Sequence, residues 1–311
     1  MKILVTGKTG QVGHELERSL QGVGEIIAVD RAQMDLSNLD QVREVIRSVK
    51  PDLIINSAAY TAVDKAESDP DAAMIINGIA PGVMAEEAKK IGAAIIHYST
   101  DYVFDGTKRG SQGEFVPYTE DDAPNPVNVY GKTKLAGELA VIDSGCPHLI
   151  LRTSWVYSTH GKNFLLTMLR LGNERSELNV VDDQWGSPTW SGWIADTTTQ
   201  IINKCAIKKS GDQQDIGLDL SSFNGIYNLV NSGYTTWCRF ARQIFIEAAG
   251  KGNLIGQNIP SVLPIGTRDY PVPATRPANS ELHIGKLQTL LGTPVTSWEH
   301  SLIACLRNFR Q

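Results

Sequence analysis

The stretch MKILVTGKTGQVG (Met1–Gly13) decides the fold class, because it places a glycine loop directly after a short apolar run. Lys2–Thr6 is predicted to form the first strand, and Gly7, Gly10 and Gly13 follow with the spacing GxxGxxG. Between a strand and a helix, such glycines allow a tight turn, close approach of the backbone to a pyrophosphate, and close helix–strand contact. The motif alone is a weak signal, since any tight strand-to-helix turn can contain it.

Asp30 strengthens the prediction of a nucleotide-binding site. It ends the second predicted strand, Ile26–Asp30, 17 residues after Gly13, where a carboxylate reaches the adenosine ribose hydroxyls. Asp30 would repel a 2′-phosphate, whereas the adjacent Arg31 could pair with one. The two residues therefore leave the choice between NADH and NADPH open.

Strands and helices alternate through the first half of the chain, which predicts βαβ units around a parallel sheet. After Val12, apolar residues recur at helical spacing as far as Val23, and Ser37 with Asp40 resembles a capping box that opens a second helix. The later predicted helices are Pro81–Ile91 and Val129–Ile142, and the later predicted strands are Leu53–Asn56, Ala93–Ser99 and Leu149–Arg152. The expected class is an α/β fold, a Rossmann-type doubly wound parallel sheet with a smaller α/β substrate-binding lobe.

The pattern loses its regularity beyond Ser154, which suggests where the domains divide. We expect residues 1–155 to form the NAD(P)-binding domain, completed by parts of 189–231. Residues 156–188 and 232–311 are expected to form the substrate-binding lobe, with helices near Thr236–Ala249 and Trp298–Asn308.

Tyr130 and Lys134 are the candidate catalytic pair, because they lie at i and i+4 on one face of a predicted helix. Carbonyl reduction needs a proton donor at the developing alkoxide, and a neighbouring ammonium stabilises the anion that a phenol leaves. Lys134 could also hold the nicotinamide ribose. A hydroxyl at the carboxyl end of the fourth predicted strand would complete the set, and strand alternation favours Thr100 over Ser99.

The composition excludes several other classes of protein. The 311 residues include 29 Lys and Arg against 34 Asp and Glu, so the net charge of −5 gives no attraction to nucleic acid. The four cysteines form no CxxC pair, and no HxxxH or HExxH pair occurs. No apolar stretch is long enough for a membrane span or a signal peptide, so we expect a cytoplasmic protein without nucleic-acid or membrane partners. His97, inside an apolar run, is expected to be a core residue.

Longer stretches of the sequence resemble one family. The glycine loop, Ser99-Thr100-Asp101 and Tyr130-x-x-x-Lys134 are similar to the extended short-chain dehydrogenase/reductases, and within these the chain resembles the dTDP-4-dehydrorhamnose reductases. The stretches that carry this resemblance are TAVDKAE (Thr61–Glu67), HYSTDYVF (His97–Phe104), NVYGKTKLAGE (Asn128–Glu138), RTSWVY (Arg152–Tyr157) and YPVPATRPANSEL (Tyr270–Leu282). The resemblance covers nearly the whole chain.

The resemblance implies reduction of the C4 ketone of dTDP-4-dehydro-L-rhamnose to dTDP-L-rhamnose by NADPH or NADH, for surface polysaccharides such as O-antigen. It implies catalysis by Thr100, Tyr130 and Lys134, with Thr100, Asp101 and Trp155 at the substrate. Arg276 and Arg268 are candidates for contact with the diphosphate. The residues assigned to the coenzyme are Gly7, Gly10, Gln11, Val12, Gly13, Asp30, Asp35, Leu36, Ala59, Tyr60, Thr61, Tyr98, Tyr130 and Lys134.

The chain departs from the family pattern in two places. The loop Lys108–Tyr118 is longer than the usual one, which leaves its role in substrate gating open. The resemblance also implies Mg²⁺ with Glu15 as a ligand and a metal-linked homodimer, but the segment WSGW after Thr189 lacks the expected second carboxylate. Magnesium binding and the homodimer therefore stay open.

Two alternatives to a reductase remain. One is a nucleotide-sugar epimerase or 4,6-dehydratase that keeps NAD bound, although Tyr102 stands where a dehydratase would carry its glutamate. The other is a non-catalytic, reductase-like regulatory subunit, against which the complete set of Thr100, Tyr130 and Lys134 argues.

Overall fold

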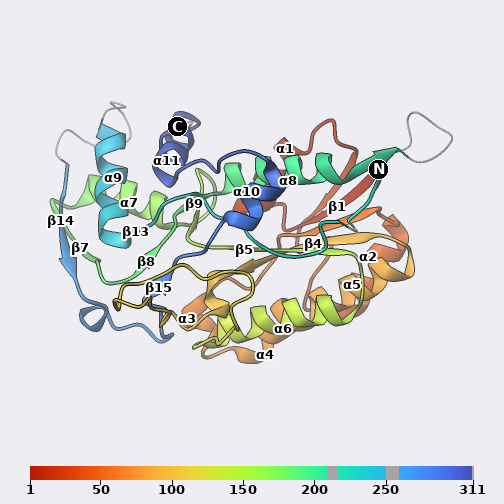
Figure 1. Cartoon of the computed structure of the whole chain (residues 1–311), viewed down its shortest axis with the longest axis horizontal. Helices are drawn as coiled ribbons and strands as arrows, with labels where there is room; N and C mark the ends of the chain where they lie inside the picture. The colour runs from red at the N-terminus through yellow and green to blue at the C-terminus, as the bar shows by residue number, and fades with distance from the viewer. Residues whose placement is uncertain (209–215, 221, 250–258, 310–311) are drawn as a thin grey trace.

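The computed structural model describes residues 1–208, 216–220, 222–249 and 259–309. A parallel sheet of six strands forms its centre, in the order β12-β5-β4-β3-β1-β2 (Figure 1). The strands are β1 (Lys2–Thr6), β2 (Glu25–Val29), β3 (Leu53–Asn56), β4 (Ala94–Thr100), β5 (His148–Thr153) and β12 (Gly225–Asn228). This arrangement confirms the predicted Rossmann-type fold class.

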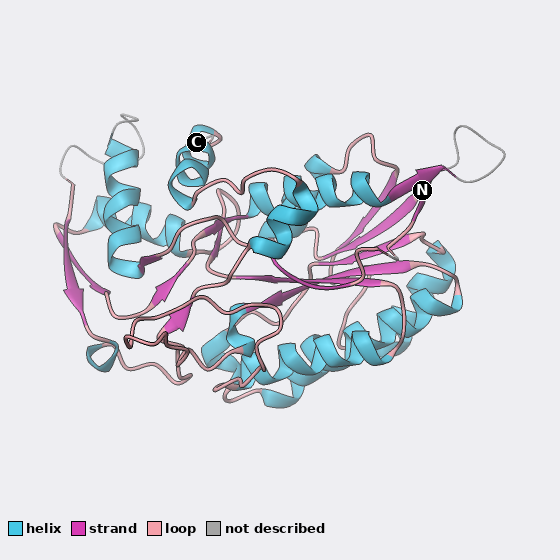
Figure 2. Ribbon diagram, viewed as in Figure 1, coloured by secondary structure: helices cyan, strands magenta, loops and turns pink. Residues whose placement is uncertain are grey.

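Helices cover both faces of the sheet (Figure 2). One face carries α1 (Gln11–Ser19), α8 (Ser191–Cys205) and α10 (Gly285–Leu291), and the other carries α2 (Leu39–Val49), α5 (Ala80–Lys90) and α6 (Val129–Asp143). Alternate side chains of a strand point to opposite faces, so Ile3 and Val5 pack with α1 while Leu4 packs with α2. Two separate cores therefore hold the sheet.

The helix expected at Pro81–Ile91 belongs to a longer helical run. It begins with α4 (Pro70–Met74), continues through a π-helical turn (Ile75–Ile79) and ends with α5. Pro81 has no backbone N–H to donate to the carbonyl of Asn77, and a π turn absorbs such an interruption. The predicted start was wrong because proline was read as the first helical residue.

Asn38, not Ser37, caps α2. The side-chain Oδ1 of Asn38 accepts a hydrogen bond from the N–H of Gln41 at 3.1 Å, whereas Ser37 Oγ donates to Asp35. The expected capping box of Ser37 and Asp40 is therefore wrong by one residue, since both Ser and Asn are suitable caps and only the backbone geometry distinguishes them.

A separate apolar core lies away from the central sheet, built mainly from α7 (Phe164–Glu174), α9 (Trp237–Ala249) and α11 (Trp298–Arg307). Beside it lie short paired strands: β7 (Glu177–Val181) with β14 (Ser261–Ile265), β6 (Val156–Tyr157) with β9 (Thr189–Trp190), and β8 (Trp185–Gly186) between β13 (Thr235–Thr236) and β15 (Asn279–Ser280). β10 (Ala206–Lys208) pairs with β11 (Ile216–Leu218), and the remaining short helices are α3 (Val63–Ala66) and the 3₁₀ turns Asp101–Val103 and Thr267–Asp269.

The expected division into domains stays a prediction. From 189–231, α8 and β12 lie with the central sheet, while positions 209–215 and 221 fall outside the described residues. From the expected substrate lobe, α10 also packs on the sheet side. In the described part of the chain, no helix is long and apolar enough to cross a membrane.

Candidate active site

A cleft of about 580 Å³ opens at the carboxyl ends of the parallel strands, where open α/β sheets bind ligands. Loops that follow β1 to β5 line it. Of the predicted coenzyme residues, the cleft is lined by Gly7, Gly10, Gln11, Val12, Asp30, Asp35, Leu36, Ala59, Tyr60, Thr61, Tyr98, Tyr130 and Lys134. Segments far apart in the sequence thus share one cavity whose chemistry suits a dinucleotide.

The glycine loop is shaped by close backbone contacts. Gly7 has φ of 73°, and a Cβ at Gly13 would lie only 2.1 Å from the carbonyl oxygen of Gly7. Gly13 therefore serves helix–strand packing and does not line the cleft. The first residue before α1, Gly10, can offer no side chain as a cap, which leaves the helix N–H groups available for a phosphate.

Asp30 does not face the cleft as an isolated anion. Lys8 Nζ lies 3.3 Å from its Oδ2, and the backbone N–H groups of Ala32 and Gln33 donate to its Oδ1. Although partial desolvation opposes them, the Gln33 and Lys8 hydrogen bonds hold the pKa of Asp30 below its ordinary value. Lys8 thereby weakens the repulsion that Asp30 alone would exert on a 2′-phosphate. Arg31 also lines the cleft, paired with Asp35 at 3.1 Å.

Lys134 projects from α6 into the buried end of the cleft. Its Nζ donates to the carbonyl oxygen of Tyr98 at 2.6 Å and lies 3.3 Å from His97 Nε2. Burial lowers the pKa of Lys134 to about 8, while the nearby Glu138 carboxylate acts in the opposite direction. Burial and the Lys134 charge also keep the pKa of His97 well below its ordinary value, so His97 is neutral. These contacts hold the Lys134 ammonium group against β4, the strand that ends at Thr100.

Tyr130 and Thr100 meet at the end of β4. The Thr100 hydroxyl acts to lower the pKa of Tyr130, and Thr100 Oγ1 donates a hydrogen bond to Asp101 Oδ1 at 2.9 Å. Burial, together with the Asp101 charge, raises the pKa of Tyr130 to about 12. Burial likewise raises the pKa of Asp101 to about 6, although hydrogen bonds from Ser280 and Thr100 oppose it. At neutral pH the phenol is protonated and can act as a proton donor.

Ser99 and Thr100 differ in their surroundings. Ser99 lines the cleft, and its buried Oγ has no hydrogen-bond partner among the residues that the structure describes. Thr100 Oγ1 instead donates to Asp101 and accepts from the N–H of Tyr102, and the Thr100 hydroxyl also acts on the pKa of Tyr130. The choice of Thr100 as the third member of the set stays a prediction.

Trp155 adopts a left-handed backbone with φ of 46°, which is uncommon for a residue other than glycine. Its ring stacks on Trp237 with centroids 3.6 Å apart, and Gly186 lies beneath it. A Cβ at Gly186 would come within 2.5 Å of the Trp155 ring. Three distant segments therefore present a half-buried aromatic platform on the substrate-lobe side.

Arg276 lies beside the catalytic residues, whereas Arg268 does not share its environment. The Arg276 guanidinium carbon is 5.9 Å from the centroid of the Tyr102 ring, and the Tyr102 ring meets the Tyr130 ring edge to face at 5.7 Å. Arg276 is paired with Asp64 at 2.8 Å. Arg268 is 91% exposed and lies 3.8 Å from its neighbour Asp269.

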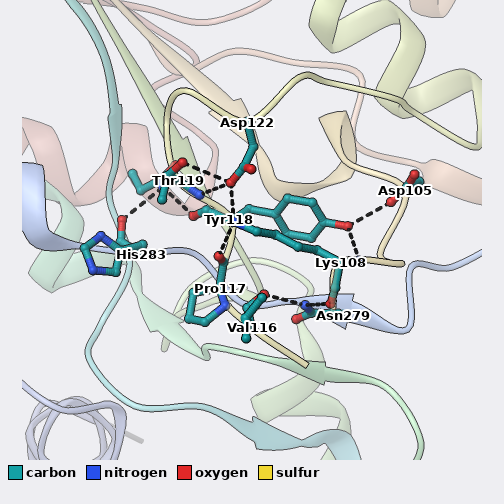
Figure 3. Close-up of polar contacts among 10 residues, drawn as sticks. Asp105, Lys108, Val116, Pro117, Tyr118, Thr119, Asp122, Asn279 and His283 are labelled. Carbon is teal, nitrogen blue, oxygen red and sulfur yellow. Dashed lines mark hydrogen bonds and ion pairs between the residues drawn. The ribbon is translucent and has the colours of Figure 1, made fainter. Parts of the chain in front are cut away.

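The long loop Lys108–Tyr118 is tied down at both ends (Figure 3). Lys108 Nζ contacts Asp122 and the carbonyl oxygen of Pro117, and the Tyr118 hydroxyl donates to Asp105 at 2.8 Å.

The same loop also pairs with the segment that follows Arg276. The N–H of Tyr118 donates to Glu281 O at 2.8 Å, the N–H of His283 donates to Tyr118 O at 2.7 Å, and Asn279 Nδ2 donates to Val116 O. Because Ser280 in this segment lies close enough to Asp101 to lower the pKa of that carboxyl, the loop braces the wall next to the catalytic residues. Opening the loop at its base would break all of these bonds.

Glu15 is a poor magnesium ligand in this arrangement. Its Oε2 accepts a hydrogen bond from Arg18 at 3.1 Å, and Arg18 also bonds to Asp196. Both carboxylates near Arg18 are therefore already paired with a cationic side chain. Within residues 1–208, 216–220, 222–249 and 259–309, no three potential ligands of the His, Cys, Asp or Glu type lie together. The described residues therefore give the predicted magnesium site no support.

Sequence reasoning missed four residues that position this site: Lys8, Asp64, Asn77 and His97. Asn77 lies in the π turn, accepts from Tyr60 N at 2.8 Å and donates to Tyr60 O and Thr133 Oγ1, which ties the coenzyme loop to the catalytic helix. His97 is a buried core residue as expected, and it also contacts Lys134. The position of His97, three residues before Thr100, is a feature of the sequence that could have indicated its place near the site.

The whole chain matches one family of known proteins. The family model described as "RmlD substrate binding domain" matches residues 1–311. The dTDP-4-dehydrorhamnose reductase of Burkholderia thailandensis is 42% identical over 308 residues, covering 99% of each chain. The enzyme of the same name from Escherichia coli is 45% identical over 303 residues, covering 96% of this chain and 95% of the relative.

Solved structures agree with these matches. The dTDP-4-dehydrorhamnose reductase of Bacillus anthracis, solved in complex with NADP, is 33% identical with a TM-score of 0.85 over 98% of both chains. A UDP-glucose 4-epimerase of Thermus thermophilus in complex with NAD has a TM-score of 0.75 at 21% identity, over 100% of this chain and 99% of that one, which shows the fold alone. By sequence and by structure, this chain belongs to the dTDP-4-dehydrorhamnose reductase family.

Proposed function

We propose that this protein reduces the C4 ketone of dTDP-4-dehydro-L-rhamnose to dTDP-L-rhamnose with NADPH or NADH. The observation that carries the proposal is that Tyr130 and Lys134 both line the coenzyme cleft, with Thr100 at the end of the strand whose residues Tyr98 and Ser99 line it, in a chain of this family. The product is a donor for surface polysaccharides such as O-antigen.

The chain's own residues supply positioning and the proton. The glycine loop and the amino end of α1 would hold the pyrophosphate of the coenzyme, and Asp30 and Lys8 would face its adenosine ribose. When bound, the reduced nicotinamide supplies the hydride that adds to C4 of the sugar. Tyr130 donates its phenolic proton to the former ketone oxygen as the alkoxide develops, and the Lys134 ammonium stabilises the phenolate that remains. Thr100 orients the ketone oxygen toward Tyr130.

The adenosine end of the cleft suits both coenzymes. Asp30 can accept hydrogen bonds from ribose hydroxyls, as NADH requires. Lys8 lies 3.3 Å from that carboxylate, and Arg31, which is paired with Asp35, lines the same cleft; both cations could pair with the 2′-phosphate of NADPH. We therefore propose that the protein accepts either coenzyme.

The two alternative functions make different demands on the site. An epimerase or dehydratase would recycle bound NAD, and a dehydratase needs an acid where Tyr102 stands. The Tyr102 ring is packed against Tyr130, and burial, with the charge of Asp101, raises the pKa of Tyr102 above its ordinary value. Tyr102 therefore cannot replace the carboxylate of an elimination. A regulatory subunit would need no ordered catalytic set.

The test is to incubate the protein with dTDP-4-dehydro-L-rhamnose and each reduced coenzyme, following absorbance and product. We expect one coenzyme to be oxidised for each dTDP-L-rhamnose formed. Sugar conversion without net coenzyme oxidation would establish the epimerase or dehydratase function. Coenzyme binding without conversion of any nucleotide sugar would favour the regulatory subunit. The cytoplasmic location, the homodimer and the magnesium ion remain predictions from the sequence.

A further inference from the structure

Asp64 joins two segments that lie far apart in the sequence. Its Oδ2 accepts a hydrogen bond from Arg276 Nη2 at 2.8 Å, and its Oδ1 accepts one from the backbone N–H of Ala274 at 3.2 Å. Asp64 lies in α3, just after Thr61, which lines the coenzyme cleft. One carboxylate therefore fixes the Arg276 side chain and also the backbone of the segment that carries it.

The guanidinium of Arg276 keeps an unused donor. Its Nη1 is buried and has no hydrogen-bond partner within the described part of the chain, although the Arg276 side chain as a whole is 18% exposed. A buried N–H of a charged group is costly to leave unpaired, so native proteins rarely keep one without a ligand or water to satisfy it. Nη1 is thus suited to an acceptor that arrives with the substrate.

An acceptor at Nη1 would lie close to the reacting groups. Arg276 stands over the Tyr102 ring, which contacts Tyr130, and the charges of both Arg276 and Asp64 act on the Tyr102 phenol. The diphosphate is the anionic part of a nucleotide sugar, and a guanidinium binds such oxygens through several donors. Asp64 uses only Nη2, which leaves Nη1 for the ligand.

We propose that Asp64 is a positioning residue that holds Arg276 in place to bind the diphosphate of the nucleotide sugar. The inference rests on the proposed function for the identity of the sugar, but the diphosphate would engage Nη1 whatever sugar it carries. Without the Asp64 charge, the guanidinium keeps its own charge but loses its fixed direction. Affinity for the diphosphate should then fall while the fold and the coenzyme cleft stay intact.

The experiment is calorimetric titration of the whole protein with dTDP, thymidine and NADPH. Asp64→Asn keeps an oxygen for the Ala274 N–H and removes the charge that holds Arg276. We expect dTDP affinity to fall about tenfold, as for loss of a charge-assisted hydrogen bond. Affinities for thymidine, which lacks the diphosphate, and for NADPH should change less than about twofold. In turnover, KM for the sugar nucleotide should rise with little change in kcat.

Two further variants separate positioning from general damage. Arg276→Ala should weaken dTDP at least as much as Asp64→Asn, and the double variant should lose no more than Arg276→Ala alone. Asp71→Asn, an exposed carboxylate nearby on α4, should change nothing. Additive losses, or equal weakening of dTDP and thymidine, would overturn the proposal. Because dTDP binding needs no turnover, this inference can stand even if the sugar is not reduced, and can fail while reduction proceeds.

Discussion

Burial controls the acid–base behaviour of the individual catalytic residues. It lowers the pKa of Lys134 to about 8 and raises that of Tyr130 to about 12. At neutral pH, Lys134 therefore keeps its charge and Tyr130 keeps its proton. Tyr130 can then donate that proton, and the charge on Lys134 can stabilise the phenolate that forms. Above about pH 8, Lys134 loses its proton and the phenolate loses its partner, so reductase activity should decline.

Replacing Tyr130 by phenylalanine tests its role as the acid. Tyr130→Phe keeps the ring that packs against Tyr102 but removes the proton, so turnover should fall by about 10²–10⁴ with NADPH affinity unchanged. Turnover at saturating substrate and NADPH titration measure the two effects. Tyr234→Phe, at a 57% exposed tyrosine, is the matched control and should behave as wild type. A Tyr130→Phe enzyme within about threefold of wild-type turnover would rule out this role.

At the scale of the elements, the continuous helical run formed by α4, the π turn and α5 packs closely against α6, the helix that carries Tyr130 and Lys134. A Cβ at Gly137 of α6 would lie 2.1 Å from the carbonyl oxygen of Asn77, which the π turn directs toward it. The Asn77 side chain then bonds both Tyr60 and Thr133. The coenzyme loop and Tyr130 are thereby held in one rigid frame.

The cap of α2 gives a prediction at this scale. Asn38→Ala removes the acceptor of the Gln41 N–H and should destabilise the protein by about 1 kcal/mol, as for other N-cap residues. Urea unfolding monitored by circular dichroism measures it. Ser37→Ala should cost under about 0.5 kcal/mol, since Ser37 does not cap the helix. A larger loss for Ser37→Ala than for Asn38→Ala would restore the capping box predicted from the sequence.

On the scale of the whole molecule, one buried ion pair fastens the catalytic helix to the sheet. Arg152 of β5 donates to Glu138 of α6 through two bonds of 2.9 and 2.7 Å, with side-chain exposures of 2% and 1%. Removing one partner of such a pair leaves an uncompensated buried charge, which is far more costly than loss of a surface pair.

Glu138→Gln should therefore destabilise the protein by about 3–5 kcal/mol, and the unfolding midpoint in urea should fall accordingly. Glu174→Gln, in the exposed pair with Arg170, should cost at most about 1 kcal/mol. The double variant Glu138→Gln/Arg152→Met should be more stable than Glu138→Gln alone, because it also removes the Arg152 charge that Glu138→Gln leaves buried without its carboxylate. Equal effects of Glu138→Gln and Glu174→Gln would show that the buried pair is not critical.

The sequence by itself determined five of the six strands of the central sheet, because each strand and helix of a βαβ unit shows its periodicity within a short window, whereas β12 was not predicted. Lys2–Thr6 and Leu53–Asn56 were predicted with the bounds that the structure has. Glycine spacing and the i,i+4 pair of Tyr130 and Lys134 are local too, and these indicated a dinucleotide cleft and a proton donor.

Tertiary structure alone decided which distant side chains meet in the site. Asp64 and Arg276 are 212 positions apart, and Lys134 contacts a histidine 37 positions away. Trp155 and Trp237 stack on each other although they lie in distant parts of the sequence. Such contacts depend on how parallel strands bring their carboxyl ends together and on how the lobe packs against them. Local periodicity carries no information about either, because it reports only on neighbours along one element.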